Sequence, residues 1–425
     1  MSKTPFHAMG AWRLALTLAF VHLVSSIDRH LLSLVLPLVK AELALTDTKL
    51  GFLQGTAYVL PYAAAIVPAG MLVDRFDRFA IILSALAVWT LGTAAFALSQ
   101  AYPQLVAARM LLGLGQAALV PAAISLITDT FGPRRSGRPI ALFTSAATFG
   151  RGLALSGGGL LLTAIVAWRS PTWLQHLDPW RVLFLVSLAV NVAAIALFST
   201  TREPPRSQSL RASGEKLRLV LAKHWPSYLA YFGSAASTIL IIQIIAAWTP
   251  TILVRSFGTS VAESGMIFGA IVVCVGPAGN VVGGFALDRL AARGVTAAPA
   301  VVAAVSLLVA VAAVSAFCLA GSLVAAIVAL AGATFTLGMA TPAGLVAIQH
   351  LTPSALRGRM TGAFLLGVTL IALGIGPVLV GWLADHVFGG AAGLRRAVLA
   401  VLWTFGIPGV ISAILAGRLE RRRGP

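Results

Sequence analysis

Two adjacent residues of opposite charge stand inside an apolar stretch, VSSIDRHLLSLVLP, which runs from Val24 to Pro37. Asp28 could bind and release a proton, and Arg29 could hold an anion. Successive side chains on a helix point about 100° apart, so neighbours in the sequence are not partners in space. We therefore expect Asp28 and Arg29 to face different walls.

A further arginine, Arg109, lies near the start of another apolar run, in RMLLGLGQAA. If the two runs cross a membrane in opposite directions, Asp28 and Arg109 lie at similar depths. A charge in hydrocarbon costs about 2.5 to 3.5 kcal/mol, so such residues face water or find partners. Two interpretations stay open. One is a fixed Asp28–Arg109 ion pair between two helices. The other is a proton switch, in which protonated Asp28 releases Arg109 or Arg29 for an anionic substrate.

Arg151 lies in TFGRGLALSGGG, where several glycines would let a helix or a bulky ligand approach closely. Its two interpretations are a helix-packing role and an anion-binding role, and we favour the second. Arg29 could instead extend toward lipid headgroups, because Pro37 and the end of the run are only about two turns away.

The composition identifies a polytopic membrane protein. Of 425 residues, 58% are hydrophobic and 10% are charged, and the mean hydropathy is +0.92. The net charge of +18 does not indicate a nucleic-acid partner, because the basic residues recur in short loops rather than on one face. Cys274 and Cys318 lie in apolar runs, which predicts neither a disulfide framework nor a metal site, and we expect no cofactor.

A bilayer core of about 30 Å needs roughly 20 apolar helical residues, and twelve runs of that kind occur. The first is too long for a signal-peptide core and is predicted to be a retained span. The approximate spans are 12–38, 48–72, 79–99, 103–129, 138–166, 181–200, 226–254, 261–287, 297–318, 322–349, 358–384 and 396–417.

The distribution of Lys and Arg predicts the orientation of these spans. With both termini inside, 21 of these residues fall on the inner side and 7 on the outer side. We therefore expect cytoplasmic termini and a location in a cell membrane, either inner or plasma.

A polar stretch from Thr200 to Trp225 separates six spans from six. This predicts a bundle over 1–200, a cytoplasmic linker over 201–224 and a second bundle over 225–425. An internal repeat supports the division: GMLVDRFDRF begins at Gly70 and GGFALDRLAAR begins at Gly283, in equivalent loops of the two halves.

With these features the chain resembles the major facilitator superfamily over nearly its whole length. Gly70, Asp74, Arg75 and Arg78 are similar to the family's loop motif between helices 2 and 3, although Asp77 stands where the family usually has Gly. The segment from Arg109 resembles its second motif, an arginine followed by close glycines. The resemblance implies an all-α membrane fold of 12 helices in two six-helix bundles.

A narrower resemblance is to the Spinster family of lipid transporters. It rests on DRHLLSLVLP, on GFLQGTAYVLPYAAAIVPAGMLVDRFDR, on Trp89-Thr90, on RMLLGLGQA and on SLITDTFGPRRSGR, in that order. Gln116 stands where many Spinster relatives carry Glu, so a second protonatable group is missing there.

The loop acids predict a cytoplasmic gate. Asp74 and Asp288, the latter followed by Arg289, would hold charge pairs there, and Asp129 would complete the first pair with Arg75 or Arg78.

Other polar positions in the spans are candidate substrate contacts, with helix-to-helix hydrogen bonds as the alternative. The candidates for substrate binding beside Arg29 and Arg151 are Tyr58, Tyr62, Gln116, Tyr231 and Gln243; Gln54, Asn280 and Gln349 are further polar positions of the same kind. His30 could titrate near neutral pH, but it ranks below Asp28.

These residues predict a secondary active transporter that moves an anionic or zwitterionic amphiphile, such as a lysolipid or a sphingoid phosphate. It would rock two bundles in alternating access, act as a monomer and couple to protons through Asp28 and Arg109. The alternatives are an organic-anion symporter or a multidrug exporter of the same fold. A membrane enzyme would need a nucleophile, a metal cluster or paired acids at depth, and a retinal receptor would need a lysine within a span; the sequence offers none of these.

Overall fold

We describe the protein from a computed structural model. It describes residues 8–132, 136–168, 177–201, 217–353, 356–390 and 392–422. The elements in chain order are α1 (Ala8–Leu43), α2 (Asp47–Gln54), α3 (Thr56–Arg75), α4 (Arg78–Leu98), α5 (Tyr102–Gln116), α6 (Leu119–Phe131), α7 (Gly137–Ala167), α8 (Pro179–Ser199), α9 (Leu217–Phe257), α10 (Val261–Ala292), α11 (Ala298–Leu319), α12 (Leu323–Leu351), α13 (Arg357–Leu383), the π-helical turn η2 (Ala384–Phe388) and α14 (Gly393–Arg421).

Twelve helical stretches in the described part are long and apolar enough to cross a membrane, which confirms the predicted all-α fold of twelve spans. Two of them are interrupted. The second span breaks at Gly55, between α2 and α3, and the fourth breaks after Gln116, between α5 and α6. The hydropathy pattern does not reveal either break, because the residues on both sides are apolar or small.

The chain forms two compact units. Unit 1 contains Met1–Leu45, Thr56–Ser209 and Ser260–Gly269, and unit 2 contains Thr46–Gly55, Leu210–Thr259 and Ala270–Pro425. Most of the predicted linker, residues 202–216, lies outside the described residues, and α9 already begins at Leu217.

One arginine in each unit ties the start of the unit's last helix to the end of an earlier helix. In unit 1, Arg181 in the first turn of α8 donates to the Ala97 carbonyl at the end of α4, at 3.0 Å, and also to the Ser99 carbonyl. In unit 2, Arg395 in the first turn of α14 donates to the carbonyls of Cys318 and Ala320 at the end of α11, both at 2.6 Å.

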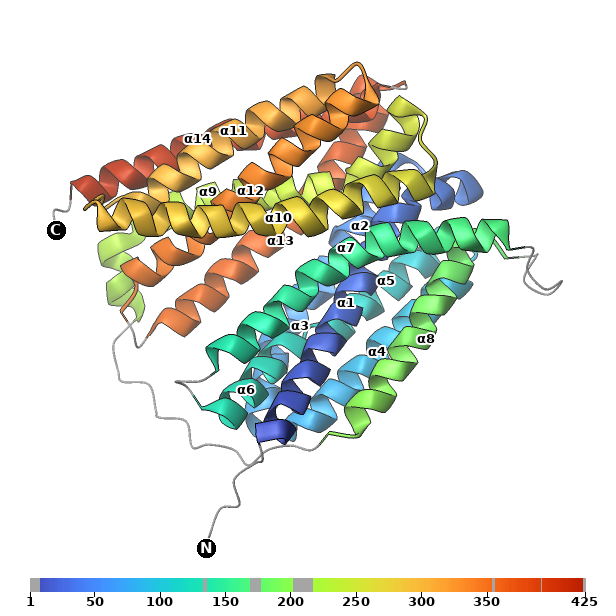
Figure 1. The fold of residues 1–425 in the computed structure, drawn as a ribbon, viewed down its shortest axis with the longest axis horizontal. Coiled ribbons are helices and arrows are strands. Elements are labelled where there is room, and N and C mark those ends of the chain that lie inside the picture. The colour runs from blue at the N-terminus through green and yellow to red at the C-terminus, as the bar shows by residue number, and fades with distance from the viewer. Residues whose placement is uncertain are drawn as a thin grey trace, which may run out of the picture. The chain divides into compact units, whose positions relative to one another are not determined.

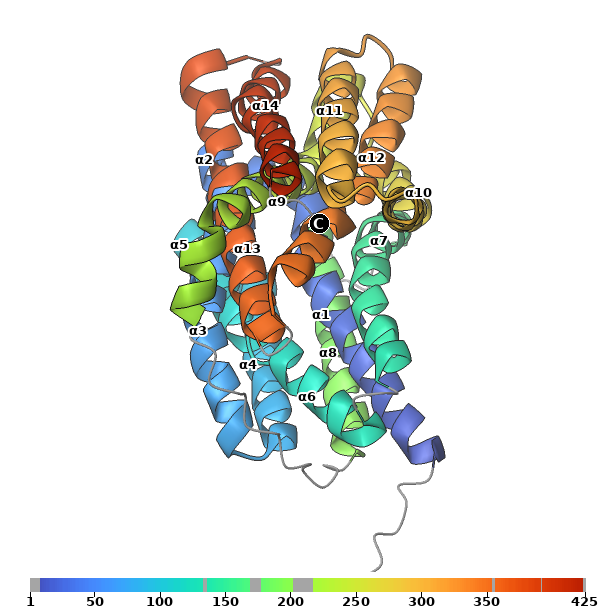
Figure 2. The same cartoon turned by 90° about the vertical axis from the view of Figure 1, so that its left-hand side faces the viewer.

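The physical reason is the same in both units. The last carbonyls of a helix have no hydrogen-bond partner within it and carry partial negative charge. A guanidinium group supplies both the missing donors and a positive charge. Figures 1 and 2 show α11 beside α14. The internal repeat therefore extends to a contact that the loop motif did not predict.

Acidic residues surround Arg181 in unit 1. Its Nη2 lies 2.5 Å from Glu42 Oε1 at the end of α1, and its Nε lies 3.9 Å from Asp178. Burial, and then the neighbouring Glu42 carboxylate, raises the pKa of Asp178, which precedes α8. Arg181 thereby holds α1, α4 and α8 together at one end of unit 1.

The two carbonyl contacts of Arg395 give a stability prediction. Arg395→Gln should lower the free energy of unfolding by about 2 to 3 kcal/mol, because hydrogen bonds from a charged donor are lost. Thermal unfolding in detergent, followed by tryptophan fluorescence, measures the change. The matched control is Arg396→Gln, which alters the exposed neighbouring residue and should leave the midpoint unchanged. Equal midpoints for the two variants would contradict the role given to Arg395.

Candidate functional site

Three helices of unit 1 bring polar side chains together around Gln116, the last residue of α5. Arg29 Nη2 on α1 donates to Gln116 Oε1 at 3.1 Å, and the Tyr58 hydroxyl on α3 donates to the same oxygen at 2.9 Å. Gln116 Nε2 donates to the Ser25 carbonyl at 3.0 Å. The amide therefore links α1, α3 and α5, and its oxygen accepts from two of the predicted substrate contacts.

Two stacked tyrosines form an aromatic wall beside the arginines. The ring centroids of Tyr58 and Tyr62 are 5.7 Å apart. Arg29 Cζ lies 4.8 Å from the Tyr58 centroid and 6.0 Å from that of Tyr62, and Arg109 Cζ lies 5.6 Å from the Tyr58 centroid. The ring electrons of an aromatic face attract a cation. Tyr58 therefore stabilises two positive charges at once.

The glycines of the RMLLGLGQ motif explain this arrangement. A Cβ at Gly113 would lie 2.1 Å from the Tyr58 carbonyl oxygen, and a Cβ at Gly115 would lie 2.6 Å from the backbone nitrogen of Trp89. Only glycine permits backbones to approach so closely. The helix α5 thus packs directly against α3 and α4, which brings Arg109 and Gln116 to the Tyr58 wall.

Arg151 on α7 adds a third positive charge. It lies close enough to Arg29 for the two guanidinium groups to repel each other electrostatically. The Nε atoms of Arg29 and Arg151 are buried and have no hydrogen-bond partner among the described residues. We call Arg29, Arg109 and Arg151 the arginine cluster. Its unsatisfied donors and excess positive charge suit an anion.

Asp28 is fully buried and points toward α4 and α8 rather than toward the arginine cluster. Ser187 Oγ donates to its Oδ1 at 2.5 Å, while Asn191 Nδ2 and Thr93 Oγ1 donate to its Oδ2 at 2.6 and 3.2 Å. Asp28 and Arg29 thus face different walls, as the helical spacing predicts.

The predicted ion pair of Asp28 with Arg109 or Arg29 is wrong for this structure. Three neutral donors from α4 and α8 satisfy the carboxylate, because the side chain leaves α1 on the side that packs against those helices. Arg109 Nη2 instead donates to the Arg29 carbonyl at 3.4 Å. Arg109 therefore acts on Asp28 through space, without a hydrogen bond to its carboxylate.

The remaining predicted substrate contacts, Tyr231 and Gln243, lie on α9 in unit 2. Tyr231 is only 1% exposed and packs in a hydrophobic core with Tyr228 and Phe364. Gln243 is half-buried. Their spacing along α9 therefore did not reveal that Tyr231 belongs to a packed core.

At the predicted gate of unit 1, Asp129 pairs with Arg78 rather than with Arg75. Arg78 Nη1 lies 2.5 Å from Asp129 Oδ2 and 2.9 Å from Ser125 Oγ, and Arg75 is exposed. Asp77, which departs from the family pattern, caps α4 by accepting from the Ala80 amide at 2.7 Å. This explains the departure, because Asp is a favoured residue at a helix N-cap.

The other predicted gate residues lie in α3 and α10. Gly70 and Asp74 lie in α3, and the Asp74 side chain is outside the described part. In unit 2, Asp288 and Arg289 are exposed, and neither side chain forms an ion pair with a residue that the structure describes. The repeated loop motif is therefore not matched by a repeated ion pair in the described residues.

Unit 2 contains an ionic cluster that the sequence analysis missed. Arg255 at the end of α9 contacts both carboxylate oxygens of Asp47, each at 2.7 Å. Asp385 accepts from the Asp47 and Thr48 amides at 3.0 and 2.6 Å and from Thr48 Oγ1 at 2.6 Å, so it caps α2. Thr46-Asp47 is readable as a helix start, but nothing local identifies its distant partners.

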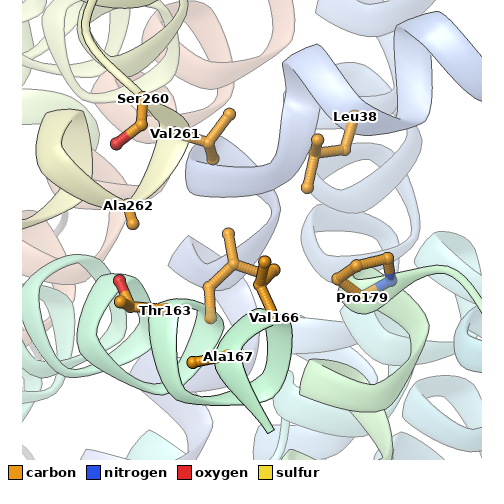
Figure 3. A pocket seen from close by; sticks show the side chains of 9 residues that line it. Leu38, Thr163, Val166, Ala167, Pro179, Ser260, Val261 and Ala262 are labelled. Carbon is orange, nitrogen blue, oxygen red and sulfur yellow. The ribbon is translucent and has the colours of Figure 1, made fainter. Parts of the chain in front are cut away.

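A cavity of about 410 Å³ opens in unit 1 where α1 and α7 end and where α8 and α10 begin (Figure 3). Its walls are apolar apart from Thr163 and Ser260, and no charged side chain lines it. This cavity is therefore unsuited to an anion. The arginine cluster remains the candidate site.

The fold and the buried charges define a polytopic membrane protein, and comparison with known proteins identifies its family. The profile of the Major Facilitator Superfamily matches residues 18–370. The chain belongs to this superfamily and is a membrane transporter rather than an enzyme.

Several relatives are similar over part or all of the chain. An MFS-type efflux pump of Mycolicibacterium smegmatis is 27% identical over 97% of this chain and 94% of its own length. The 3-(3-hydroxy-phenyl)propionate transporter of Escherichia coli is 26% identical over 63% of both chains. Protein spinster homolog 1 of Xenopus tropicalis is 26% identical over 64% of this chain and 53% of its own length.

A solved structure shares the fold over the whole chain. The inward-facing, unoccupied bacterial homolog of the human lysosomal transporter Spinster has a TM-score of 0.85, covers 99% of both chains and is 23% identical. The predicted resemblance to Spinster proteins is therefore confirmed in sequence and in fold.

The contacts of Asp28 give a second stability prediction. Asn191→Ala should lower the free energy of unfolding by about 1 to 3 kcal/mol, because a buried carboxylate loses a donor. The substitution also removes the oxygen that accepts from Trp89 Nε1 at 3.2 Å. Thermal unfolding in detergent measures the effect. Asn280→Ala is the control, since Asn280 is exposed and should tolerate the change. An unchanged midpoint for Asn191→Ala would mean that the Asp28 network contributes nothing to packing.

Proposed function

We propose that the protein moves an anionic or zwitterionic amphiphile, of the lysolipid or sphingoid-phosphate kind, across a cell membrane by alternating access. The observation that carries the proposal is the arginine cluster, with its two buried Nε atoms that have no described partner. A buried positive charge is costly until a counter-charge arrives. A phosphate or carboxylate at this site offsets that cost and receives the free donors.

The tyrosine wall extends the proposal from an anion to an amphiphile. Tyr58 and Tyr62 stack beside Arg29, so a ligand held by the guanidinium groups lies next to aromatic surface. The charged head group of an amphiphile would contact the guanidinium groups, and its apolar body would contact the aromatic surface. Gln116 holds the wall and Arg29 in place through one shared oxygen.

Proton coupling belongs to the same proposal, with Asp28 as the group that binds the proton. An ionised carboxylate accepts from all three of Ser187, Asn191 and Thr93, whereas a protonated one becomes a donor at one oxygen. One of those hydrogen bonds then fails, and the contact of α1 with α4 and α8 loosens. Arg109, which donates to the Arg29 carbonyl, links this movement of α1 to the arginine cluster.

The orientation and the gate complete the proposal. The charge bias of the loops supports cytoplasmic termini in an inner or plasma membrane, for a protein that acts as a monomer. Asp129 with Arg78, together with Gly70, Asp74 and Arg75, would form the cytoplasmic gate of unit 1, and Asp288 and Arg289 would act in the equivalent loop of unit 2. Partners other than substrate, protons and membrane lipids are not needed.

A second candidate is an organic-anion symporter. An aromatic carboxylate fits an arginine beside stacked tyrosines as well as a lipid head group does, and one relative is named for 3-(3-hydroxy-phenyl)propionate. Multidrug export is a third, since another relative is named an efflux pump. Competition between lysophosphatidate and 3-phenylpropionate for the purified protein separates the first two.

Removal of one guanidinium group tests the anion site. Arg151→Gln should weaken binding of both lysophosphatidate and 3-phenylpropionate about 10- to 100-fold, because a charged hydrogen bond is lost. Microscale thermophoresis of the detergent-purified protein measures this. The control is Arg138→Gln, near the exposed start of the same helix, which should bind as the wild type does. Unweakened binding by Arg151→Gln would remove Arg151 from the site.

The coupling role of Asp28 is tested by transport. In proteoliposomes with an imposed pH gradient, Asp28→Asn should make uptake of the same two probes less dependent on the gradient than in the wild type, while exchange across equal pH persists. Asp178→Asn removes an acid outside the spans and serves as the control. If uptake by Asp28→Asn depends on the gradient as strongly as uptake by the wild type, coupling does not pass through this residue.

A further inference from the structure

The helices α1 and α7 pack with a constant offset along their seam. His22 Nδ1 lies 2.8 Å from the Phe143 carbonyl oxygen, and Ser26 Oγ donates to the Ala147 carbonyl at 2.6 Å. Both pairs are separated by 121 residues. From the first pair to the second, the chain advances four residues on α1 and four residues on α7, so the two helices run in the same direction. A further four residues on each helix place His30 opposite Arg151. The two helices lie side by side in Figures 1 and 2.

The two helices also pack closely along this seam. A Cβ at Gly150 would lie 2.5 Å from the Leu23 carbonyl oxygen, so the two backbones nearly touch there. One turn beyond His30, a Cβ at Gly265 would meet both Leu34 Cδ1, at 2.4 Å, and the Leu155 carbonyl oxygen, at 2.6 Å. Leu34 and Leu155 are again 121 residues apart. His30 and Arg151 therefore share one level of the seam.

The hydrogen bonds of His30 leave one ring nitrogen available. Its side chain is 7% exposed, and Nδ1 lies 2.8 Å from the Ser26 carbonyl oxygen. A carbonyl only accepts, so Nδ1 carries a hydrogen and Nε2 is the basic nitrogen. No residue in the described part of the chain forms a hydrogen bond to Nε2.

The charges around His30 are all positive. Arg151 on α7, Arg29 on α1 and Arg109 on α5 act on it electrostatically, and no acid of the described residues does so. The nearest acid in the sequence, Asp28, is held on the opposite side by α4 and α8. A proton on Nε2 would add a fourth positive charge to the arginine cluster, whereas a bound anion would offset it.

We propose that His30 takes a proton from the aqueous medium onto Nε2 when an anion binds beside Arg151 and Arg29, so that each anion enters the site with a proton. In this step an O–H bond of a hydronium ion breaks, an Nε2–H bond forms and a neutral water molecule is released. The resulting imidazolium donates its Nε2–H to the anion. This inference rests on the proposed anion site. It assigns the binding-linked proton to His30 and leaves the proton at Asp28 to control helix packing.

Linkage makes the inference quantitative. If anion binding promotes protonation, then protonation must promote anion binding by the same factor. Affinity for the anion should therefore fall up to about tenfold per pH unit between the pKa of His30 in the free protein and its higher pKa in the anion-bound protein. A purely structural histidine would show no such slope.

The experiment measures protons taken up on binding. Octyl sulfate, whose charge does not titrate, and 3-phenylpropionate are each titrated into protein in nanodiscs of zwitterionic lipid. Calorimetry in two buffers of different ionisation enthalpy then gives the number of protons absorbed. The wild type should take up about one proton per anion, and His30→Gln should bind the anion but absorb almost none.

The control and the opposing outcomes are specific. His22→Gln makes the same change two turns earlier on α1, where the ring stacks on Phe143 at 4.2 Å, and should behave as wild type. Absence of proton uptake by the wild type overturns the inference without any variant. Uptake that persists in His30→Gln also overturns it, while the anion site stands. If neither probe binds the wild type, the proposed anion site fails and this inference fails with it.

Discussion

The arrangement of the charged residues within the spans of unit 1 follows from the cost of placing charge inside a membrane. Asp28, Arg29, Arg109 and Arg151 all lie within spans, where an unsatisfied charge costs a few kcal/mol. The protein meets this constraint in two ways on one helix. The acid on α1 is enclosed by hydroxyl and amide donors from α4 and α8, and the neighbouring base is set against an amide and two aromatic rings.

The two solutions have different consequences. Asp28 has a complete set of donors, so its charge is part of the packing of three helices. Arg29 and Arg151 each keep a buried Nε atom without a described hydrogen-bond partner. In the proposed function, a bound anion supplies the missing acceptor and the counter-charge. The packing that achieves this depends on glycine, because Gly113 and Gly115 let α5 reach two neighbouring backbones and present its arginine and glutamine together.

The two halves of the chain repeat some of these devices and not others. Arg181 and Arg395 each satisfy the terminal carbonyls of an earlier helix, which is a requirement of any helix end. The loop motif is repeated in sequence, yet at the two predicted gates the ion pair that the described residues form is that of Arg78 with Asp129. Repetition thus follows the needs of the scaffold, and the buried arginines with unpartnered Nε atoms among the described residues lie in unit 1.

The sequence by itself determined the class of fold, because a run of about 20 apolar residues has one stable solution in a bilayer and twelve such runs are legible. It also identified the buried charges and the different directions of Asp28 and Arg29, since helical geometry is local. Only the tertiary structure decided their partners. The carboxylate of Asp28 binds Ser187 and Asn191 on α8, more than 150 residues away, rather than Arg109. Only the tertiary structure likewise showed that Asp47 pairs with Arg255, and that His30 faces α7 near Arg151. Contacts between helices depend on their rotation and offset, and no spacing within one helix encodes those quantities.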